Sequence, residues 1–222
     1  MQTYKEEFIT FLCKSGALKF GDFTLKSGRK CPYFLNMGSF NKGSQIGTLG
    51  MYYAEALNAN CGNFDVVFGP AYKGIPLAVA SAAAMFKLFS KDVGFSYNRK
   101  EAKDHGEGGS IIGAAITKET KLVIVDDVMT AGTALRESMD LMAKLGNPTI
   151  NGVLIAVDRM ERGQGTKSAA QEVKEQFGVT VYSICTILEI LEFLHNREID
   201  GVVYIDDAKK AAIEGYRKEY GV

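Results

Sequence analysis

The sequence has few cysteines, and they are arranged neither as metal ligands nor as a disulfide framework. Only four are present among 222 residues, at positions 13, 31, 61 and 185. Structural zinc sites use closely spaced Cys pairs, and small secreted scaffolds are dense in Cys. The spacing argues against both classes and predicts reduced thiols in a cytoplasmic protein.

The sequence also lacks long hydrophobic runs and an excess of charge of either sign. The longest nearly apolar stretch, residues 75–86, is well short of the roughly 20 residues that span a bilayer. The N-terminus carries Lys5, Glu6 and Glu7 before a short apolar stretch, which is unlike a signal peptide. The 26 basic residues equal the 26 acidic ones, whereas nucleic-acid-binding proteins are usually basic. We therefore expect no membrane and no nucleic acid as partner.

What is present is the composition of one globular domain. Hydrophobic residues make up 46% of the chain and charged residues 23%, which is enough for a sizeable core. No repeat and no Pro- or Ser-rich linker divides the sequence, so we treat 1–222 as a single domain. The 24 glycines are a high share and indicate tight turns or backbone that closely approaches a ligand.

The order of β-rich and helical segments predicts an α/β fold with a mostly parallel central sheet flanked by helices. Three β-rich runs are each followed by a short polar or Gly-containing stretch and then a helical segment. Such alternation is typical of βαβ units. The expected strands are 65–68, 93–97, 110–116, 121–125, 153–157 and 179–184, and the expected helices are 75–88, 134–145 and 167–177.

The first 60 residues follow a different pattern. The expected elements are a helix near 5–14, alternating segments at 20–26 and 33–36, and a helix over 44–58. We interpret about 1–60 as a small N-terminal hood on an α/β core with C-terminal helices, about 61–222. In open α/β sheets ligands bind beyond the carboxyl ends of the strands, so those ends are where a site is expected.

The strongest single signal is the segment 121–134, with the sequence KLVIVDDVMTAGTA. An apolar strand leads into Asp126 and Asp127, then into a loop of small residues that opens a helix. Backbone N–H groups and hydroxyls at a helix N-terminus suit a phosphate. Two carboxylates would repel a phosphate, but they are good acceptors for vicinal sugar hydroxyls. The segment therefore predicts a ribose 5-phosphate site; for a bare Asp-Asp pair the alternative is an acidic helix N-cap.

Other nucleotide-binding motifs are missing. The glycines at 106–109 and at 163–165 have neither the spacing of a P-loop nor that of the Gly-x-Gly-x-x-Gly dinucleotide motif. ATPase and dehydrogenase interpretations thereby lose their main support.

Four segments together resemble the type I phosphoribosyltransferases and, among these, the orotate phosphoribosyltransferases. Residues 125–133 resemble the family's phosphoribosyl pyrophosphate (PRPP) motif, and the other three segments are 23–34, 68–76 and 99–109. The resemblance extends from about 15 to 190. It implies the type I phosphoribosyltransferase fold. It also implies transfer of the phosphoribosyl group from 5-phospho-α-D-ribose 1-diphosphate to orotate, giving orotidine 5′-monophosphate and pyrophosphate in pyrimidine (UMP) biosynthesis.

The resemblance also implies which residues contact each substrate. For PRPP these are Lys26, Tyr72, Lys73, Arg99, Lys100, Lys103, His105, Asp126, Asp127, Val128, Met129, Thr130, Ala131, Gly132, Thr133 and Ala134. For orotate they are Lys26, Phe34, Leu35, Thr130 and Arg159, and the catalytic residues are Lys103, His105, Asp126 and Asp127. Many members have Phe where this chain has Leu35, which leaves that position a backbone contact. An aromatic residue in a β-run, such as Phe34, is more often part of the core.

The segment 99–109 combines basic and acidic residues with three glycines. A solvated loop is the ordinary interpretation of such a run. The glycines favour a mobile lid, whose Lys and Arg donors would stabilise charge on a leaving pyrophosphate. The resemblance implies a homodimer in which the 99–110 loop reaches the active site of the partner.

The implied chemistry is a displacement at the anomeric carbon of ribose by the ring nitrogen of the pyrimidine. No motif for an activated Ser or Cys nucleophile is present, so no covalent enzyme intermediate is expected. The resemblance implies Mg²⁺ as cofactor, carried largely by the pyrophosphate substrate, since Mg²⁺ prefers phosphate oxygens and retains water. We therefore expect no dedicated protein metal ligands.

Two other classes of function remain open. A non-catalytic regulator could bind PRPP through 126–133, but it would not need the 23–34 and 99–109 segments as well. A transferase acting on a purine or on uracil is closer, and an assay across several bases would distinguish the three.

Overall fold

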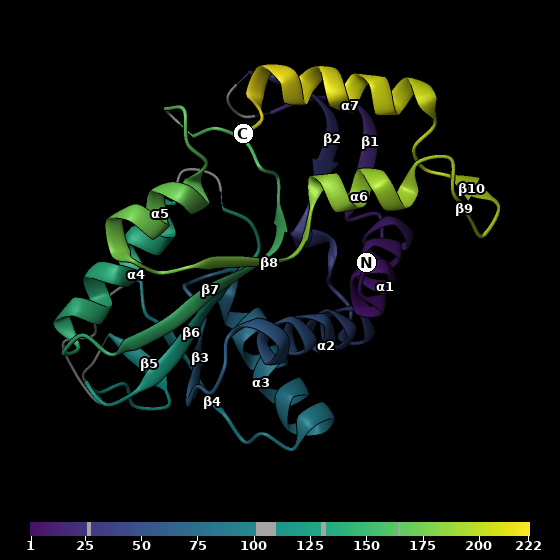
Figure 1. The fold of residues 1–222 in the computed structure, drawn as a ribbon. Coiled ribbons are helices and arrows are strands. Elements are labelled where there is room, and N and C mark those ends of the chain that lie inside the picture. Colours follow the sequence, from purple (N-terminus) through teal and green to yellow (C-terminus); the bar gives the residue numbers. More distant parts are fainter. Residues whose placement is uncertain (26–27, 101–109, 130–131, 164) are drawn as a thin grey trace.

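The computed structural model describes residues 1–25, 28–100, 110–129, 132–163 and 165–222, and it has an α/β architecture (Figure 1). A central six-stranded sheet has the strand order β5-β4-β3-β6-β7-β8. All neighbouring pairs are parallel except β4 and β5, which are antiparallel at one edge. The strands are β3 (Val66–Phe68), β4 (Gly94–Asn98), β5 (Ile111–Gly113), β6 (Lys121–Asp126), β7 (Thr149–Asp158) and β8 (Val181–Thr186). The predicted mostly parallel sheet is confirmed.

Helices cover both faces of this sheet. They are α2 (Gly43–Asn60) and α3 (Gly74–Phe89) on one face, and α4 (Thr133–Lys144) and α5 (Ala169–Phe177) on the other (Figure 1). The strand β6 shows why both faces need cover. Its residues Val123 and Val125 pack into the core beneath α2 and α3, whereas Leu122 and Ile124 pack into the core beneath α4 and α5. Successive side chains of a strand point to opposite faces, so an apolar strand is buried on both sides.

A second layer lies beside the sheet and combines both ends of the chain. Its N-terminal elements are α1 (Thr3–Lys14), β1 (Leu18–Thr24), β2 (Lys30–Leu35) and the short 3₁₀ helix η1 (Met37–Ser39). Its C-terminal elements are α6 (Ile187–Leu194), β9 (Glu198–Ile199), β10 (Val202–Val203) and α7 (Asp207–Tyr220). The strands β1 and β2 form an antiparallel hairpin, and α7 lies across it (Figure 1). Tyr33 of β2 is 1% exposed and meets Tyr216 of α7 edge-on, with ring centroids 6.1 Å apart.

Most expected elements are present, with shifted ends. The strand expected at 110–116 is only Ile111–Gly113, because the chain turns at Gly113, whose φ is +100°. A Cβ at this glycine would lie 2.2 Å from the carbonyl oxygen of Phe95, so only glycine fits there. The β9–β10 hairpin was not expected, since its strands are too short to leave a periodic pattern. None of the helices within the described ranges is both long and apolar enough to cross a membrane.

Candidate active site

The predicted PRPP segment lies where a strand, a loop and a helix meet at the carboxyl edge of the sheet. The strand β6 ends at Asp126, and α4 begins at Thr133. Gly132, which precedes the helix, has a φ of +69°, a left-handed conformation that favours glycine. The first N–H groups of α4 therefore open toward the end of β6, as expected for an anion site.

The two carboxylates differ in their surroundings. Asp127 is buried, and its carboxylate accepts a hydrogen bond from its neighbour's backbone, Val128 N, at 2.9 Å. Its second oxygen forms an ion pair with the ammonium group of Lys73, which comes from the start of α3. Asp126 is half-buried, and its Oδ1 accepts from Asp127 N at 2.8 Å. The backbone carbonyl of Asp126 accepts a hydrogen bond from the buried Tyr53 hydroxyl at 2.8 Å, which fixes this end of β6 against α2.

Burial raises the pKa of the Asp126 carboxyl from 3.8 to about 6. The hydrogen bond from Asp127 N and the nearby Lys73 ammonium oppose this rise, and the charge of Asp127 adds to it. The Asp126 carboxylate is thus partly dehydrated, and it lies next to the Asp127 carboxylate, which is already paired with Lys73. A partly dehydrated acceptor gains most when a ligand hydroxyl donates to it.

This environment predicts a pH-dependent stability difference for Asp126→Asn. Because the native pKa of Asp126 exceeds the unfolded value of 3.8, its native state binds the proton more tightly, and its contribution to stability falls as pH rises from about 4 to about 6. The variant lacks this loss, so above that range its free energy of unfolding should exceed that of the parent by up to roughly 3 kcal/mol. Chemical denaturation at about pH 4 and about pH 7.5 checks this. An equal difference between variant and parent at both pH values would contradict it.

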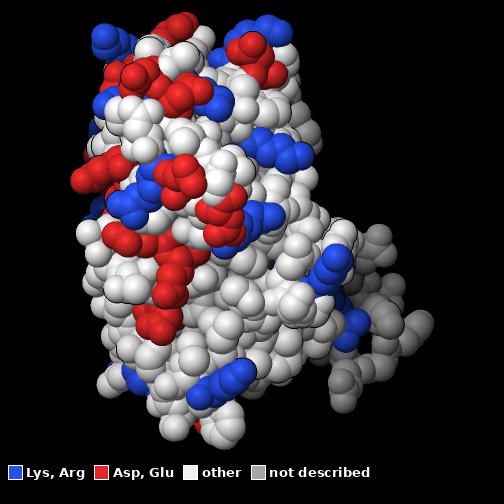
Figure 2. All heavy atoms as spheres, turned by 90° about the vertical axis from the view of Figure 1, so that its right-hand side faces the viewer, with Lys and Arg blue, Asp and Glu red and all other residues white. Residues whose placement is uncertain are grey.

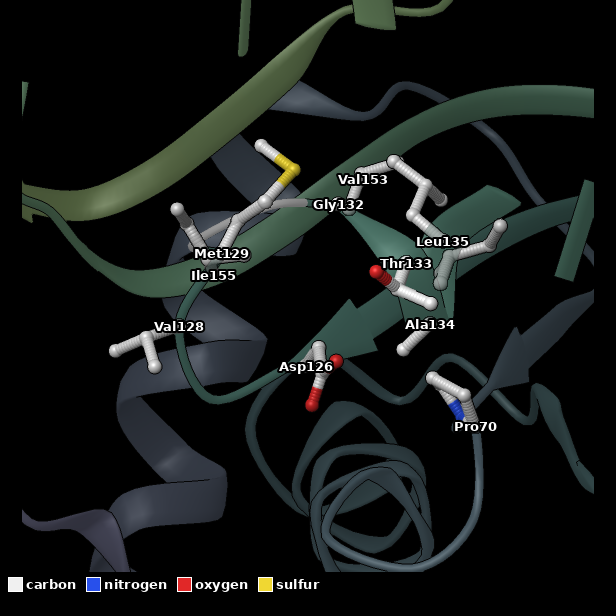
Figure 3. A pocket seen from close by; sticks show the side chains of 11 residues that line it. Pro70, Asp126, Val128, Met129, Gly132, Thr133, Ala134, Leu135, Val153 and Ile155 are labelled. Atoms are coloured by element: carbon white, nitrogen blue, oxygen red, sulfur yellow. The ribbon is translucent and has the colours of Figure 1, made fainter. Parts of the chain in front are cut away.

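A pocket of about 130 Å³ opens between the end of β6 and the start of α4. Figure 3 shows Asp126 and Pro70 along its lower side, Thr133 and Ala134 between them and the sheet, and Met129 above. Val128 and Gly132 also line it. A second pocket of about 250 Å³ shares Pro70, Thr133 and Ala134 and extends toward Asn98 and Lys100. The structure therefore brings Asp126 and the described residues of 128–134 together around these two pockets. Asp127 and Lys73 instead line a separate pocket of about 350 Å³ between η1, α2 and α3.

The segment after β3 forms the opposite wall. Gly69 and Gly74 approach each other so closely that a Cβ on Gly69 would lie 2.0 Å from the Gly74 carbonyl oxygen. The Ala71–Tyr72 peptide bond is cis, and Ala71 N donates to Asn98 Oδ1 at 2.8 Å. Tyr72 is 71% exposed.

Lys100 and Tyr72 lie together at the start of the predicted lid. The Lys100 ammonium lies 5.6 Å from the centroid of the Tyr72 ring, and Arg99 N donates to Ser110 O at 2.9 Å. Arg99 and Lys100, the two predicted PRPP contacts at the start of the lid, thus follow Asn98 directly at the carboxyl end of β4. Five predicted site residues lie outside the described ranges: Lys26, Lys103, His105, Thr130 and Ala131.

Tyr33 and Phe34 are consecutive in β2, so their side chains point to opposite faces of the β1–β2 hairpin. Phe34 is 39% exposed and stacks on Phe23 with ring centroids 5.5 Å apart, so it is not a core residue. Leu35 is half-buried and packs against the core. Tyr33 points the other way and is buried beneath α7. An exposed aromatic face is available for stacking in this hairpin, and it comes from Phe34 rather than from Leu35.

Arg159 follows β7 and is largely buried. Its guanidinium forms an ion pair with Glu161, with Nη2 2.7 Å from Oε1, and its centre lies 5.0 Å from the centroid of the Tyr33 ring. Glu161, Tyr33, Tyr53 and Asn98 were not predicted as site residues from the sequence.

Of these, Asn98 could have been predicted, because it lies at the carboxyl end of a strand, β4, where ligands bind in open α/β sheets.

Within the described ranges, no group of three or more His, Cys, Asp or Glu side chains is arranged to hold a metal ion. Asp126 lines the first pocket and Glu137 lines the second, whereas Asp127 is paired with Lys73 and lines a different pocket.

Comparison with known proteins agrees with this geometry. Residues 38–183 match the family model of the phosphoribosyl transferase domain. The chain is 49% identical to the orotate phosphoribosyltransferase of Lachnoclostridium phytofermentans, over 100% of this chain and 99% of that protein. It is 48% identical to the enzyme of the same name from Salmonella newport, over 100% of both chains.

A solved structure gives the same result. The orotate phosphoribosyltransferase of Francisella tularensis is 36% identical, with a TM-score of 0.85, covering 97% of this chain and 100% of that one. These matches extend across the strands, the helices and the cavity described above. The chain therefore belongs to the orotate phosphoribosyltransferase family, the pentosyltransferases of pyrimidine biosynthesis that carry the type I phosphoribosyltransferase fold.

Proposed function

We propose that PRPP binds in the cavity between β6 and α4, and that orotate binds between this cavity and the β1–β2 hairpin. The products are orotidine 5′-monophosphate and pyrophosphate. The observation that carries the proposal is the pocket in which Asp126 faces the N-terminus of α4. The N–H groups of α4 and the Thr133 hydroxyl suit the 5-phosphate, and the carboxylates suit the ribose hydroxyls.

Catalysis in this site rests on positioning and electrostatics. The ribose is held by its hydroxyls and its phosphate, so that the anomeric carbon faces the orotate nitrogen. The pyrophosphate leaves toward Lys100, which lines the second pocket, and Lys73, which precedes α3, and their ammonium groups stabilise its growing charge. We assign Lys103 and His105, which lie outside the described ranges, to the same leaving group.

The residues present fit a Mg²⁺ ion that arrives with the pyrophosphate. Asp126 and Glu137 line different pockets and Asp127 is paired with Lys73, so these carboxylates do not enclose an ion, and Mg²⁺ readily keeps phosphate and water ligands. When bound, the ion neutralises charge on the leaving pyrophosphate. Asp126, which lines the first pocket and has no ion-pair partner among the described residues, would contact the hydration shell of the ion or the ribose hydroxyls.

Arg159→Ala is expected to weaken the use of orotate far more than that of PRPP. The guanidinium would donate charge-assisted hydrogen bonds to orotate, and the loss of one raises the barrier by roughly 1.5–3 kcal/mol, or about 10–150-fold in kcat/KM for orotate. Steady-state kinetics with each substrate varied in turn measures this. A matched control is Arg197→Ala, which removes a guanidinium stacked on Phe193 at 4.2 Å. Equal losses for both substrates would show that Arg159 is structural.

We also propose a homodimer in which the second copy covers the exposed face of α3. Four apolar residues with helical spacing are exposed there: Pro76, Val79, Ala83 and Phe86. Phe86 is 60% exposed, and Phe95 of the adjacent β4 is 38% exposed. Figure 2 shows few charged side chains at the height of α3, whereas charges of both signs are dense at the height of α6 and α7. Exposed contiguous apolar surface of this kind is typical of protein interfaces.

The position of this face explains why the sites would be shared. The segment that connects β4 to β5 begins at Arg99 and Lys100, next to Tyr72 at the start of α3. A second copy on α3 would therefore lie beside Arg99 and Lys100, with which the 99–110 segment begins, and we propose that this segment contributes to the partner's site. All four cysteine thiols are free and buried, which supports a reducing, cytoplasmic location.

A further inference from the structure

The ion pair between Arg159 and Glu161 lies at the junction of the hairpin and the sheet. The side chain of Arg159 is 17% exposed and that of Glu161 is 14% exposed. Both groups are therefore largely removed from water, and each needs the other to offset the loss of hydration.

Two hydrogen bonds and an ion-pair contact converge on a single oxygen of Glu161. Its Oε1 accepts hydrogen bonds from Arg159 Nε at 3.0 Å and from the Tyr33 hydroxyl at 2.8 Å, and it lies 2.7 Å from Arg159 Nη2 in the ion pair. Burial raises the pKa of Tyr33, so its hydroxyl remains protonated and donates at neutral pH. The carboxylate thus fixes two of the three guanidinium nitrogens and is itself fixed by the hairpin.

Further contacts restrict the guanidinium from its other sides. It lies over the Tyr33 ring, and its Nη2 also lies 3.4 Å from the Cys31 sulfur. The third nitrogen, Nη1, has no hydrogen-bond partner within the described ranges. It is also absent from the buried polar atoms without a partner, so among the described residues it is not a buried, unsatisfied donor. This leaves one donor nitrogen accessible, with its direction set by the contacts of the other two.

A long side chain held in this way needs little further ordering when a ligand binds. Arginine carries about 2 kcal/mol of rotamer entropy, and a planar guanidinium loses less of it per hydrogen bond when it is already oriented. Binding residues work best when a surrounding shell fixes their rotamers.

We propose that Glu161, itself held by Tyr33, is a positioning residue that orients Arg159 Nη1 toward orotate and so contributes to selection of the base. The inference rests on the proposed contact between Arg159 and orotate. Neither Glu161 nor Tyr33 is assigned a contact with PRPP, so their effect should be confined to the base.

The experiment compares four variants with the parent: Arg159→Ala, Glu161→Gln, the double variant, and Glu189→Gln. The last is the matched control, because Glu189 forms a part-buried ion pair of 2.7 Å with Lys5 and lines none of the pockets described above. kcat/KM is measured for orotate and for PRPP, together with Tm. We expect Glu161→Gln to lower kcat/KM for orotate by about tenfold or more, to change KM for PRPP by less than about twofold, and to leave Tm close to that of Glu189→Gln.

The double variant tests whether Glu161 acts through Arg159. If it does, adding Glu161→Gln to Arg159→Ala should lower kcat/KM for orotate by less than about twofold more. A further large loss would overturn the inference, and so would equal losses for both substrates in Glu161→Gln.

The contact between Arg159 and orotate and the positioning role of Glu161 can be tested separately. If Arg159→Ala leaves the use of orotate unchanged, the proposed contact fails and the inference falls with it. If Arg159→Ala is impaired and Glu161→Gln is not, the contact stands and only the positioning role is wrong.

A second variant keeps the test decisive if Glu161→Gln folds poorly. Tyr33→Phe retains the aromatic ring under the guanidinium and removes one of the two hydrogen bonds to Glu161 Oε1. We expect kcat/KM for orotate to fall by about three- to tenfold with KM for PRPP unchanged. An unchanged kcat/KM for orotate in Tyr33→Phe would overturn the role of the hairpin in fixing Glu161.

Discussion

Asp126→Asn combined with Asp127→Asn is expected to lower turnover by about 10²–10³-fold, or roughly 3–4 kcal/mol of transition-state stabilisation. Both side chains lie at the end of β6, where Asp126 lines the pocket and Asp127 pairs with Lys73. Asn keeps the size and one acceptor oxygen of each residue but loses the charge. Losing the ion pair with Lys73 lowers the free energy of unfolding, whereas removing the buried charge of Asp126 raises it. Because the two effects oppose each other, the variant should fold.

Steady-state turnover and thermal melting together separate chemistry from folding. Asp65→Asn is the matched control, because the Asp65 carboxylate accepts from Lys121 N at 2.8 Å, at the opposite end of β6. This control should keep the turnover of the parent. A double variant that melts like the parent and works within about threefold of it would refute the assignment of the carboxylates to the ribose hydroxyls.

Mixing two inactive variants should restore about a quarter of the parent activity if the active sites are shared. Lys103→Ala removes the loop cation, and Asp126→Asn/Asp127→Asn removes the carboxylates of the other wall. With random exchange about half of the dimers are mixed, and in each of these one site combines an intact loop with intact carboxylates while the other carries both lesions. The restored activity therefore requires that loop and carboxylates come from different subunits.

Native mass spectrometry of the mixture confirms that the subunits have exchanged. Activity that stays as low as in either variant alone, after confirmed exchange, would show that the 99–110 loop serves its own subunit. Phe86→Lys, on the exposed face of α3, provides a second control, since a dimer formed through this face should dissociate and lose the complementation.

The part of the fold nearest the site could be predicted because its signals are local. The segment 121–134 contains a strand, two carboxylates and a helix start in one stretch, and the structure places them as β6, the pocket wall and α4. The alternation of strands and helices likewise predicted the parallel sheet, since each βαβ unit is contiguous in sequence.

Contacts between distant parts of the chain could not be predicted in this way. Glu161 is 128 residues from Tyr33, and Tyr53 is 73 residues from Asp126, so no periodicity or spacing connects them. The layer beside the sheet also combines both ends of the chain, because Tyr216 of α7 packs on the hairpin. Nor could the partner of Lys73 be anticipated: a lysine after a strand looks like a phosphate donor, and only the fold brings it to Asp127.

The most direct test of the whole account is a transfer assay with PRPP and Mg²⁺ across four bases: orotate, uracil, hypoxanthine and adenine. The account predicts formation of orotidine 5′-monophosphate and pyrophosphate with orotate, and kcat/KM values at least about 10²-fold lower with the other three bases. Comparable or higher kcat/KM with uracil or with either purine would contradict the assignment of the base. PRPP binding without transfer to any base would contradict the catalytic role of the site.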